Sequence, residues 1–272
     1  MKLDLHIHST ASDGTCTPSE VVERAVAGGL DVIALADHDT TAGVGAAMQA
    51  AAGLRIHVIP AIELSSTHGG EEVHILGYFI NPVAPAIEAH RVRSRAGRED
   101  RMRRMLDLLA LQGVRLSYED LKAQLDADDV APARPHLARA LVAAGHAHSV
   151  PRAFAELIGN DSPAYLPTQI ATPFEVIETI LDAGGIPVWA HPETEQLDAL
   201  LHRLVAAGLA GLEVHRPRNP QAHVDFLEAL AKDHNLLVTG GSDWHGPAGK
   251  RELGKFFVSG EEVGPFLAAG GL

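Results

Sequence analysis

The chain has 272 residues, which is long enough for one barrel domain with an insertion and for a large buried core. Its formal net charge of −13 opposes long-range attraction of duplex DNA, whose binding depends on many Lys and Arg contacts to phosphates. No apolar run approaches the roughly 18 to 20 residues of a membrane span, and the start Met1-Lys2-Leu3-Asp4 leads into a predicted strand rather than a signal peptide, so we expect a cytoplasmic protein.

The first 80 residues alternate short apolar runs with helical patterns. Thr17-Pro18-Ser19-Glu20 is a capping box with proline at the first helical position, so a helix begins there and ends at Gly28-Gly29. A second helix is predicted over about 41–52. Strands are predicted over 3–7, 32–36, 55–64 and 72–80. This strand–helix–strand order favours a parallel sheet.

Helical periodicity replaces the strand pattern between residues 84 and 163, as Met102, Met105, Leu106 and Leu109 illustrate. We therefore expect a helical subdomain over 84–163, inserted between two parts of a barrel, residues 1–83 and 164–272. A second capping box, Thr172-Pro173-Phe174-Glu175, begins a helix that ends at Gly184-Gly185. Strands then alternate with helices again, over 186–190, 211–214 and 236–239.

Residue types that bind metals follow the predicted strands. They are found in His6-Ile7-His8, Asp37-His38-Asp39, Ala190-His191-Pro192 and Gly241-Ser242-Asp243-Trp244-His245. Ligands at the ends of parallel strands converge on one mouth of a barrel or sheet. Residues two apart on a strand share a side, so His6 and His8 can hold one ion while Leu3, Leu5 and Ile7 face the other way.

Two further candidates lie on predicted strands, Glu63 on 55–64 and His74 on 72–80. The candidate ligands are then nine nitrogen and oxygen donors without a thiolate: His6, His8, Asp13, His38, Glu63, His74, His191, Asp243 and His245. Such a set suits manganese, iron or zinc. Glu213, near the end of strand 211–214, remains open as a ligand, as an acceptor behind a ligand or as a structural partner. Asp13 has a rival interpretation as a turn residue within Ser12-Asp13-Gly14.

In this order, the strings HIHSTASDGTCTP, ADHDT, IPAIELS, VHILGY, AHP and GSDWHG resemble the PHP (polymerase and histidinol phosphatase) family. The resemblance implies an α/β fold, a distorted seven-stranded β/α barrel that holds two or three divalent metal ions. It implies one ion on His6, His8, Glu63 and Asp243, a second on Glu63, His74 and His191, and a third on Asp13, His38 and His245. Glu63 would bridge the first two ions.

The resemblance also implies a metal-dependent phosphatase that acts through a metal-activated hydroxide, because coordination lowers the pKa of water to about 7. We expect Asp13, Glu63 and His191 to be the catalytic residues. The acid that protonates the leaving alkoxide stays open among Asp13, His191 and a metal-bound water.

Within the insertion, Arg134-Pro135-His136 and the following Leu137-Ala138-Arg139-Ala140-Leu141 resemble a pattern of the nucleotide-directed branch of the family. That branch includes nucleoside 3′,5′-bisphosphate phosphatases, AMP phosphatases and a 5′-to-3′ oligoribonuclease. The resemblance implies that Arg134 and His136 hold a phosphate over the metals, since a guanidinium binds phosphate through two hydrogen bonds. The alternative is a helix start with proline in its first turn.

Seven arginines fall between residues 91 and 104, and most are expected to form a solvated helix face. Arg95, Arg98 and Arg101 recur at helical spacing, so they are candidates for lining one face, and we include Arg98 among the substrate-binding residues. The single cysteine, Cys16, excludes an internal disulfide framework.

The segment Asp161-Ser162-Pro163 departs from the pattern of the bisphosphate-specific relatives in this family. Those relatives tend to have a lysine at the position of Ser162. A neutral serine loses a contact to a second phosphate, so the expected substrate is AMP, or a nucleoside 3′,5′-bisphosphate if the arginines of residues 91–104 supply the missing charge. The alternatives are 5′ ends of short RNA in an exoribonuclease, histidinol phosphate in a phosphatase, and a non-catalytic scaffold. The oligomeric state stays open.

Overall fold

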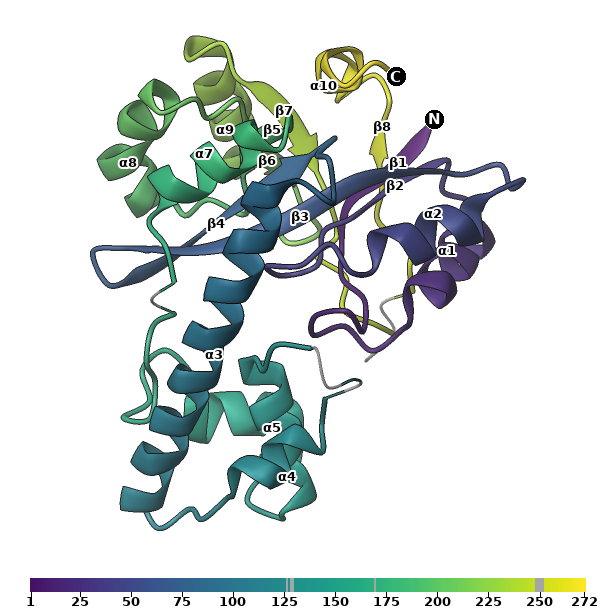
Figure 1. Ribbon diagram of the computed structural model, residues 1–272. Coiled ribbons are helices and arrows are strands. Elements are labelled where there is room, and N and C mark those ends of the chain that lie inside the picture. The colour runs from purple at the N-terminus through teal and green to yellow at the C-terminus, as the bar shows by residue number, and fades with distance from the viewer. Residues whose placement is uncertain (126, 128–129, 169, 248–251) are drawn as a thin grey trace.

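The computed structural model describes residues 1–125, 127, 130–168, 170–247 and 252–272. Its strands form one sheet in the order β7-β6-β5-β4-β3-β2-β1-β8, which curls into a nearly closed barrel (Figure 1). The strands are β1 Lys2–Ile7, β2 Val32–Leu35, β3 His57–His68, β4 Glu71–Tyr78, β5 Ile186–Trp189, β6 Gly211–His215, β7 Leu237–Gly240 and β8 Val258–Ser259. The segment after β7 joins β1, because the Trp244 N–H donates to the His6 carbonyl at 3.3 Å and the His8 N–H donates to the Trp244 carbonyl at 2.9 Å. The expected α/β barrel is confirmed, and the two-residue β8 adds an eighth strand beside β1.

Strand direction is parallel within β1–β2–β3 and within β5–β6–β7, but β4 is antiparallel to both of its neighbours. The expectation of a parallel sheet is therefore wrong for β4. The reason is that β3 continues to His68, beyond the predicted end at residue 64, which leaves only Gly69 and Gly70 before β4. Their φ values of 62° and 91° suit a two-residue hairpin turn, whereas a parallel connection needs a dozen residues or more.

Helices surround the barrel, and the last of them contributes Phe266 and Leu267 to the cluster inside it. They are α1 Pro18–Ala27, α2 Val44–Ala51, α7 Pro173–Asp182, α8 Thr194–Ala206, α9 Gln221–Asp233 and α10 Gly264–Ala269. Both predicted capping boxes are present, at Thr17 and at Thr172. In each box the threonine hydroxyl accepts from the backbone N–H three residues later, which fixes where the helix begins.

The helices between β4 and α7 form a second body of structure beside the mouth of the barrel (Figure 1). They are α3 Pro85–Leu111, α4 Tyr118–Lys122, α5 Arg134–Ala143, α6 Val150–Ala153 and the π-helix η1 Phe154–Ile158. Apolar side chains of α3 and α5, among them Met102, Met105, Leu137 and Leu141, pack into a cluster that is separate from the barrel core. Because α3 is continuous over 27 residues, it connects the barrel rigidly to this helical group.

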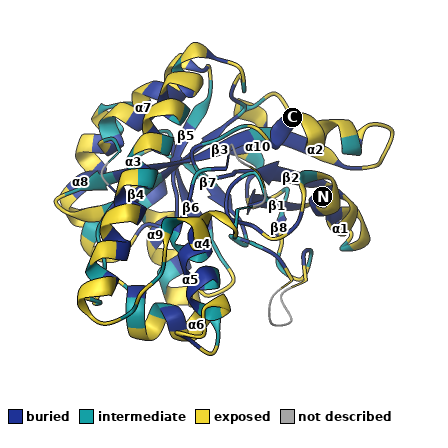
Figure 2. Ribbon diagram, turned by 60° about the horizontal axis from the view of Figure 1, so that its bottom comes forward, coloured by how far each residue is buried: buried dark blue, intermediate teal, exposed yellow. Residues whose placement is uncertain are grey.

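Three apolar clusters stabilise the barrel, one inside it and two between the sheet and its helices. Figure 2 shows the buried strands at the centre and the exposed faces of the helices outside. Leu3 and Leu5 pack inside the barrel, whereas Ile7 packs outside with α1 and α2. The prediction that these three side chains share one face is therefore wrong, because a register shift between Asp4 and Ile7 reverses the alternation.

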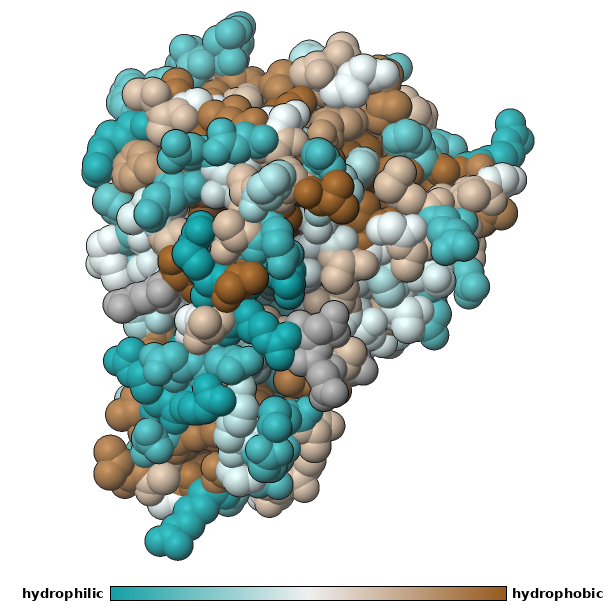
Figure 3. All heavy atoms as spheres, viewed as in Figure 1, coloured by the Kyte–Doolittle hydropathy of each residue, from teal (hydrophilic) through white to brown (hydrophobic). Residues whose placement is uncertain are grey.

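The exposed face of α3 is largely hydrophilic (Figure 3), with Val92 and Leu111 as exposed apolar exceptions. Arg91, Arg103 and Arg104 make ion pairs of 2.7 to 3.8 Å with acidic residues three or four positions away. Arg98 and Arg101 are instead buried, each with 6% exposure. Among the described residues, no helix is both long enough and apolar enough to span a membrane.

Candidate metal centre

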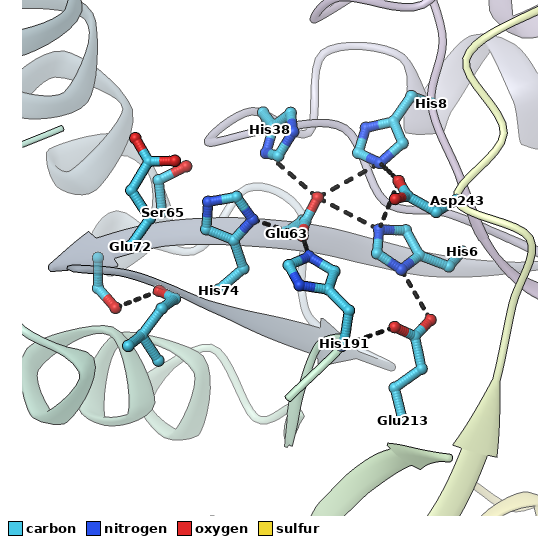
Figure 4. A network of polar contacts seen from close by, with 12 residues as sticks. His6, His8, His38, Glu63, Ser65, Glu72, His74, His191, Glu213 and Asp243 are labelled. Carbon is cyan, nitrogen blue, oxygen red and sulfur yellow. Dashed lines mark hydrogen bonds and ion pairs between the residues drawn. The ribbon is translucent and has the colours of Figure 1, made fainter. Parts of the chain in front are cut away.

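All nine candidate ligands lie at one mouth of the barrel, and Figure 4 labels all of them except Asp13 and His245. Seven of them come from the end of a strand or the loop that follows it, as the sequence predicts for converging strands, whereas Glu63 and His74 lie within β3 and β4. The segment after β7 supplies Asp243 and His245, which are far from β1 in sequence but adjacent to it in space. The close approach requires Gly241, because a Cβ there would lie 2.3 Å from the His6 Cβ and 2.5 Å from its backbone nitrogen.

Glu63 lies at the centre of the group. Its Oε2 faces three imidazole nitrogens, His6 Nε2 at 3.2 Å, His8 Nε2 at 3.3 Å and His38 Nδ1 at 3.2 Å. The carboxylate is 1% exposed. Asp243 Oδ1 lies 3.6 Å from His6 Nε2 and 3.3 Å from His8 Nε2, so it joins the same side of Glu63.

The other oxygen of Glu63, Oε1, faces a different pair of imidazoles. It lies 2.9 Å from His74 Nδ1 and 3.1 Å from His191 Nε2. One carboxylate thus presents each of its oxygens to a separate set of nitrogen donors. This is the arrangement that a carboxylate shared between two cations requires.

A third group surrounds Asp13. Its Oδ1 lies 3.3 Å from His245 Nε2 and 3.8 Å from His8 Nδ1, and its Oδ2 lies 3.9 Å from His38 Nε2. Donor atoms of these four residues all lie within 4.8 Å of one another. His8 and His38 therefore each face both the Asp13 group and the Glu63 group, through different ring nitrogens. The family resemblance implies that each of these histidines holds one ion, and the geometry does not separate them as strictly.

The donors fit divalent cations. Ions held at about 2.1 Å from each nitrogen or oxygen place neighbouring donors about 3 Å apart, close to the separations around Glu63. Within the described part of the chain, five buried atoms of this cluster have no hydrogen-bond partner: His6 Nε2, His8 Nδ1, His8 Nε2, His38 Nδ1 and Glu63 Oε2. Buried polar atoms are normally satisfied. Cations shared by these atoms would satisfy them, so the residues present fit a group of metal ions.

Electrostatics favours ionised carboxylates in the cluster. Burial alone would raise the pKa of Glu63, but His38, His6 and His74 outweigh it and hold that pKa well below its usual range. Burial lowers the pKa of His38 to about 3, so this imidazole is neutral and keeps a lone pair for a ligand bond. Burial opposes charge on His245 as well, yet the neighbouring Asp13 carboxylate raises its pKa to about 10.

Two buried aspartates outside the nine candidate ligands hold the loops in place. Asp37 accepts hydrogen bonds from the Ser9 backbone N–H and hydroxyl, both at 2.7 Å, and from the Ser12 hydroxyl at 2.6 Å, which fixes the loop that carries Asp13. Asp4 accepts from the Ser242 backbone N–H at 2.8 Å, and its burial raises its pKa to about 6. Asp4 could have been recognised from the sequence, because it is a charged residue within a predicted buried strand.

Backbone strain is concentrated at this mouth. Among the described residues, five that are not glycine have positive φ, and three of these lie at or beside the cluster: Asp39 at 56°, His191 at 34° and Asp243 at 53°. Residues in this region of φ cost energy and persist where the surrounding contacts determine them.

Arg98, predicted to bind substrate, is engaged with the barrel. Its Nε and Nη2 donate to Asp39 Oδ2 at 2.8 and 2.6 Å, and Nη2 also donates to the Ser65 hydroxyl at 2.7 Å. Asp39 Oδ1 lies 2.8 Å from His90 Nε2, so two residues of α3 hold the residue that follows His38. The long helix is thereby fixed to the mouth of the barrel.

Arg134 and Arg101 meet at Glu72 of β4. Arg134 Nη2 and Arg101 Nη2 donate to the two oxygens of Glu72 at 3.1 and 2.9 Å. The guanidinium of Arg134 also lies 5.1 Å from the centre of the Tyr165 ring. Sequence reasoning missed Glu72, although it stands two positions before His74 on the same strand.

His136 is fully buried, its Nδ1 accepts from the Ala133 N–H at 3.0 Å, and its Nε2 has no partner among the described residues.

Two cavities adjoin the cluster. An inner cavity of about 140 Å³ has Asp13, His38 and His74 on its metal side and Arg98, Arg101 and Arg134 opposite. An outer cleft of about 670 Å³ begins at His74, His191 and Arg134 and extends past Tyr165 to a rim that includes Glu71, Glu193 and Glu195. Ser162 lines neither cavity, and its hydroxyl donates to the Leu157 carbonyl. The helical group thus places basic residues directly opposite the candidate ligands.

Comparisons with known proteins agree with this geometry. The PHP domain family matches residues 4–140. A 5′-3′ exoribonuclease of Haemophilus influenzae is 36% identical over 259 residues, which are 93% of this chain and 93% of the relative. A 3′,5′-nucleoside bisphosphate phosphatase of Chromobacterium violaceum is 34% identical over 258 residues, 93% of this chain and 90% of the relative.

Solved structures give the same result. A Bifidobacterium adolescentis protein described as a metal-dependent phosphoesterase superposes with a TM-score of 0.87 at 36% identity, over 98% of this chain and 95% of its own. A Chromobacterium violaceum protein described as an amidohydrolase, crystallised with sulfate and no metal, superposes with a TM-score of 0.86 at 32% identity, over 95% and 92% of the two chains.

Proposed function

Since this chain belongs to the PHP domain family of metal-dependent phosphoesterases, we propose that it hydrolyses the phosphate monoester of a nucleotide, either a nucleoside 3′,5′-bisphosphate or AMP. The observation that carries the proposal is the position of Glu63. This carboxylate divides two sets of histidines directly beneath a cavity that three arginines line on the opposite side. Cations below and guanidinium groups above are what a phosphate dianion requires.

The nine residues of the cluster would hold two or three divalent ions, of manganese, iron or zinc. Bound ions supply Lewis acidity, which lowers the pKa of water and neutralises phosphate charge. Glu63 would be a ligand shared by two of the ions. Asp13 and His191 lie on opposite sides of Glu63, and although burial alone would raise the pKa of Asp13, His245 and His38 hold that pKa well below its usual range. Of the two, His191 is therefore the residue that would deliver a proton to the leaving oxygen.

Arg134 would bind the phosphate from the side of the insertion, where it lines the inner cavity. His136 is buried behind the lining residue Pro135 and would donate from its unpartnered Nε2. Arg98 lines the same inner cavity but is bound to Asp39. We therefore assign it the roles of fixing α3 to the barrel and lining this cavity. In this proposal residues 84–163 act as a lid on the barrel formed by 1–83 and 164–272.

The outer cleft would hold the rest of the substrate. Its volume of about 670 Å³ exceeds what a phosphate needs, and Tyr165 offers an aromatic face on which a base can stack. The carboxylates of Glu71, Glu193 and Glu195 at its rim can accept hydrogen bonds from ribose hydroxyls but would repel a second phosphate. These carboxylates favour AMP over a 3′,5′-bisphosphate or the 5′ end of a short RNA.

A substrate screen tests the proposal. Purified protein with added Mn²⁺ is assayed for phosphate release from AMP, a nucleoside 3′,5′-bisphosphate and histidinol phosphate, and for nucleotide release from a 5′-phosphorylated oligoribonucleotide. We expect phosphate release from the nucleotides, with AMP ahead. Nucleotide release alone would favour the exoribonuclease, and no hydrolysis of any ester would favour the scaffold.

Arg134→Ala tests the lid. Loss of one partner of a partly buried phosphate contact costs about 2 to 5 kcal/mol, or roughly 30-fold to several thousand-fold in kcat/KM. Arg104→Ala is the matched control, because Arg104 is an exposed arginine of the same helical group that pairs with Asp100. Normal nucleotide hydrolysis by Arg134→Ala would contradict the proposed role of the insertion in binding phosphate. It would not contradict the proposed metal centre.

A further inference from the structure

Glu213 on β6 is a buried carboxylate that contacts two of the proposed ligands from the side away from Glu63. Its side chain is fully buried. Oε1 lies 2.8 Å from His6 Nδ1, and Oε2 accepts from the backbone N–H of His191 at 2.8 Å. Figure 4 shows His6 between the two glutamates, with Nε2 toward Glu63 and Nδ1 toward Glu213. The two contacts of Glu213, with His6 Nδ1 and with the His191 backbone N–H, leave the proposed ligating atoms of both histidines free.

We infer that Glu213 is a positioning residue that sets the imidazole tautomer of His6 and the backbone of His191. The inference rests on the proposed ligand assignment. A neutral imidazole has one N–H and one lone pair. A carboxylate is only an acceptor, so it requires the N–H of His6 to be on Nδ1. The lone pair is then on Nε2, the atom that faces Glu63 and Asp243 and has no hydrogen bond within the described chain.

The two contacts together require a carboxylate rather than any polar group. Both partners of Glu213 present a donor, the His6 Nδ1–H and the His191 N–H. A glutamine of the same shape has one acceptor and one donor end. If its oxygen faces His191, its NH₂ faces His6 and forces the proton onto Nε2, which removes the lone pair that a metal needs. If the amide is turned over, its NH₂ faces the His191 N–H, so two donors meet and the His191 N–H loses its acceptor.

His191 shows why its N–H needs a fixed acceptor. Its φ of 34° lies in a region that residues other than glycine rarely adopt. Such a conformation persists only where surrounding contacts determine it. The Glu213 carboxylate supplies one of these contacts, and it thereby directs the His191 imidazole toward Glu63 Oε1 at 3.1 Å.

Arg216 extends the network to a third proposed ligand. Its Nη2 donates to Asp243 Oδ2 at 2.9 Å, and its Nε lies 3.4 Å from Glu213 Oε2. Glu213 is therefore connected to proposed ligands on both sides of Glu63. Hydrogen bonds of this kind orient the ligands of a metal site, and their loss typically weakens metal affinity by about 10- to 100-fold.

The experiment measures metal binding without substrate. Metal-free wild-type protein, Glu213→Gln and Glu213→Asp are titrated with Mn²⁺, and bound metal per chain and dissociation constants are determined. Glu228→Gln is the matched control, because Glu228 is a half-exposed carboxylate that lies 3.6 Å from His215 Nε2 and, among the described residues, makes no ion pair with a proposed ligand. We expect Glu213→Gln to weaken at least one Mn²⁺ by about 10- to 100-fold. We expect Glu213→Asp, which keeps both acceptor oxygens, to weaken it less, and Glu228→Gln to match the wild type.

Two further measurements distinguish positioning from a purely structural role. Excess Mn²⁺ should restore most of the turnover of Glu213→Gln, because the residue does not touch the reacting atoms. In zinc-loaded protein, ¹⁵N spectra should show His6 bound through Nε2 in the wild type, with that signature reduced in Glu213→Gln.

Several results would overturn the inference. Wild-type Mn²⁺ affinity in Glu213→Gln is one, and Glu213→Asp binding no better than Glu213→Gln is another. Lost turnover with unchanged metal binding would also reject the positioning role. If the wild type itself bound no metal, the proposed function would fail instead, so the two failures are distinguishable.

Discussion

Glu72→Gln tests whether the helical group is held to the barrel by a buried charge cluster. Burial alone would raise the pKa of Glu72, but Arg101 and Arg134 outweigh it and lower that pKa from 4.5 to about 2. A carboxyl with a lowered folded-state pKa stabilises the folded state above its unfolded pKa, and this stabilisation is lost as the pH falls toward the folded pKa. The ionic contribution of Glu72 is therefore complete at pH 7 and decreases below about pH 4.5.

The lowered pKa corresponds to about 3 kcal/mol of unfolding free energy at pH 7 and about 2 kcal/mol at pH 3.5. Glu72 is 18% exposed, so these values are upper bounds. Urea unfolding of metal-free protein at both pH values measures the difference between the wild type and Glu72→Gln. We expect that difference to shrink as the pH falls. Glu71→Gln is the control, because Glu71 is the exposed neighbour on the same strand, and it should change stability by less than about 0.5 kcal/mol. A wild-type advantage that is constant or grows toward acid would refute the reasoning.

Three further variants test the metal centre and its packing. Glu63→Gln should lose at least one ion by elemental analysis and reduce turnover by orders of magnitude, and unchanged metal content with full activity would contradict its bridging position. Asp13→Ala should lower turnover while the other ions remain, whereas the loss of all metal would show that the three groups are not separable. Gly241→Ala would place a Cβ 2.3 Å from that of His6, so it should destabilise the protein by about 1 to 3 kcal/mol in urea unfolding, while Gly45→Ala, which meets no atom within 4 Å, should not.

The sequence predicts the candidate site well because ligand position follows from local rules. A strand places alternate residues on one side, and parallel strands end at one edge, so His6, His8 and His38 were expected to meet. Both capping boxes were also readable, since each is complete within four residues.

The features that the sequence did not predict depend on contacts between distant segments. The register shift that separates Ile7 from Leu5 arises in the pairing of β1 with β2. The antiparallel β4 follows from the extension of β3 through polar residues that do not read as a buried strand. Glu72 meets Arg134 across 62 positions, and no local pattern reports such a pairing. Glu213 could be noticed near a strand end, but only the structure shows that both its oxygens face donors.

Metal reconstitution tests the central claim most directly. Protein freed of metal by a chelator is titrated with Mn²⁺ while bound metal per chain and phosphate release from AMP are followed in the same samples. We expect no hydrolysis without metal and a return of activity as two to three ions bind per chain. Hydrolysis at the full rate by metal-free protein, or no hydrolysis of AMP or any other phosphate ester by the fully loaded protein, would contradict a metal-dependent phosphoesterase.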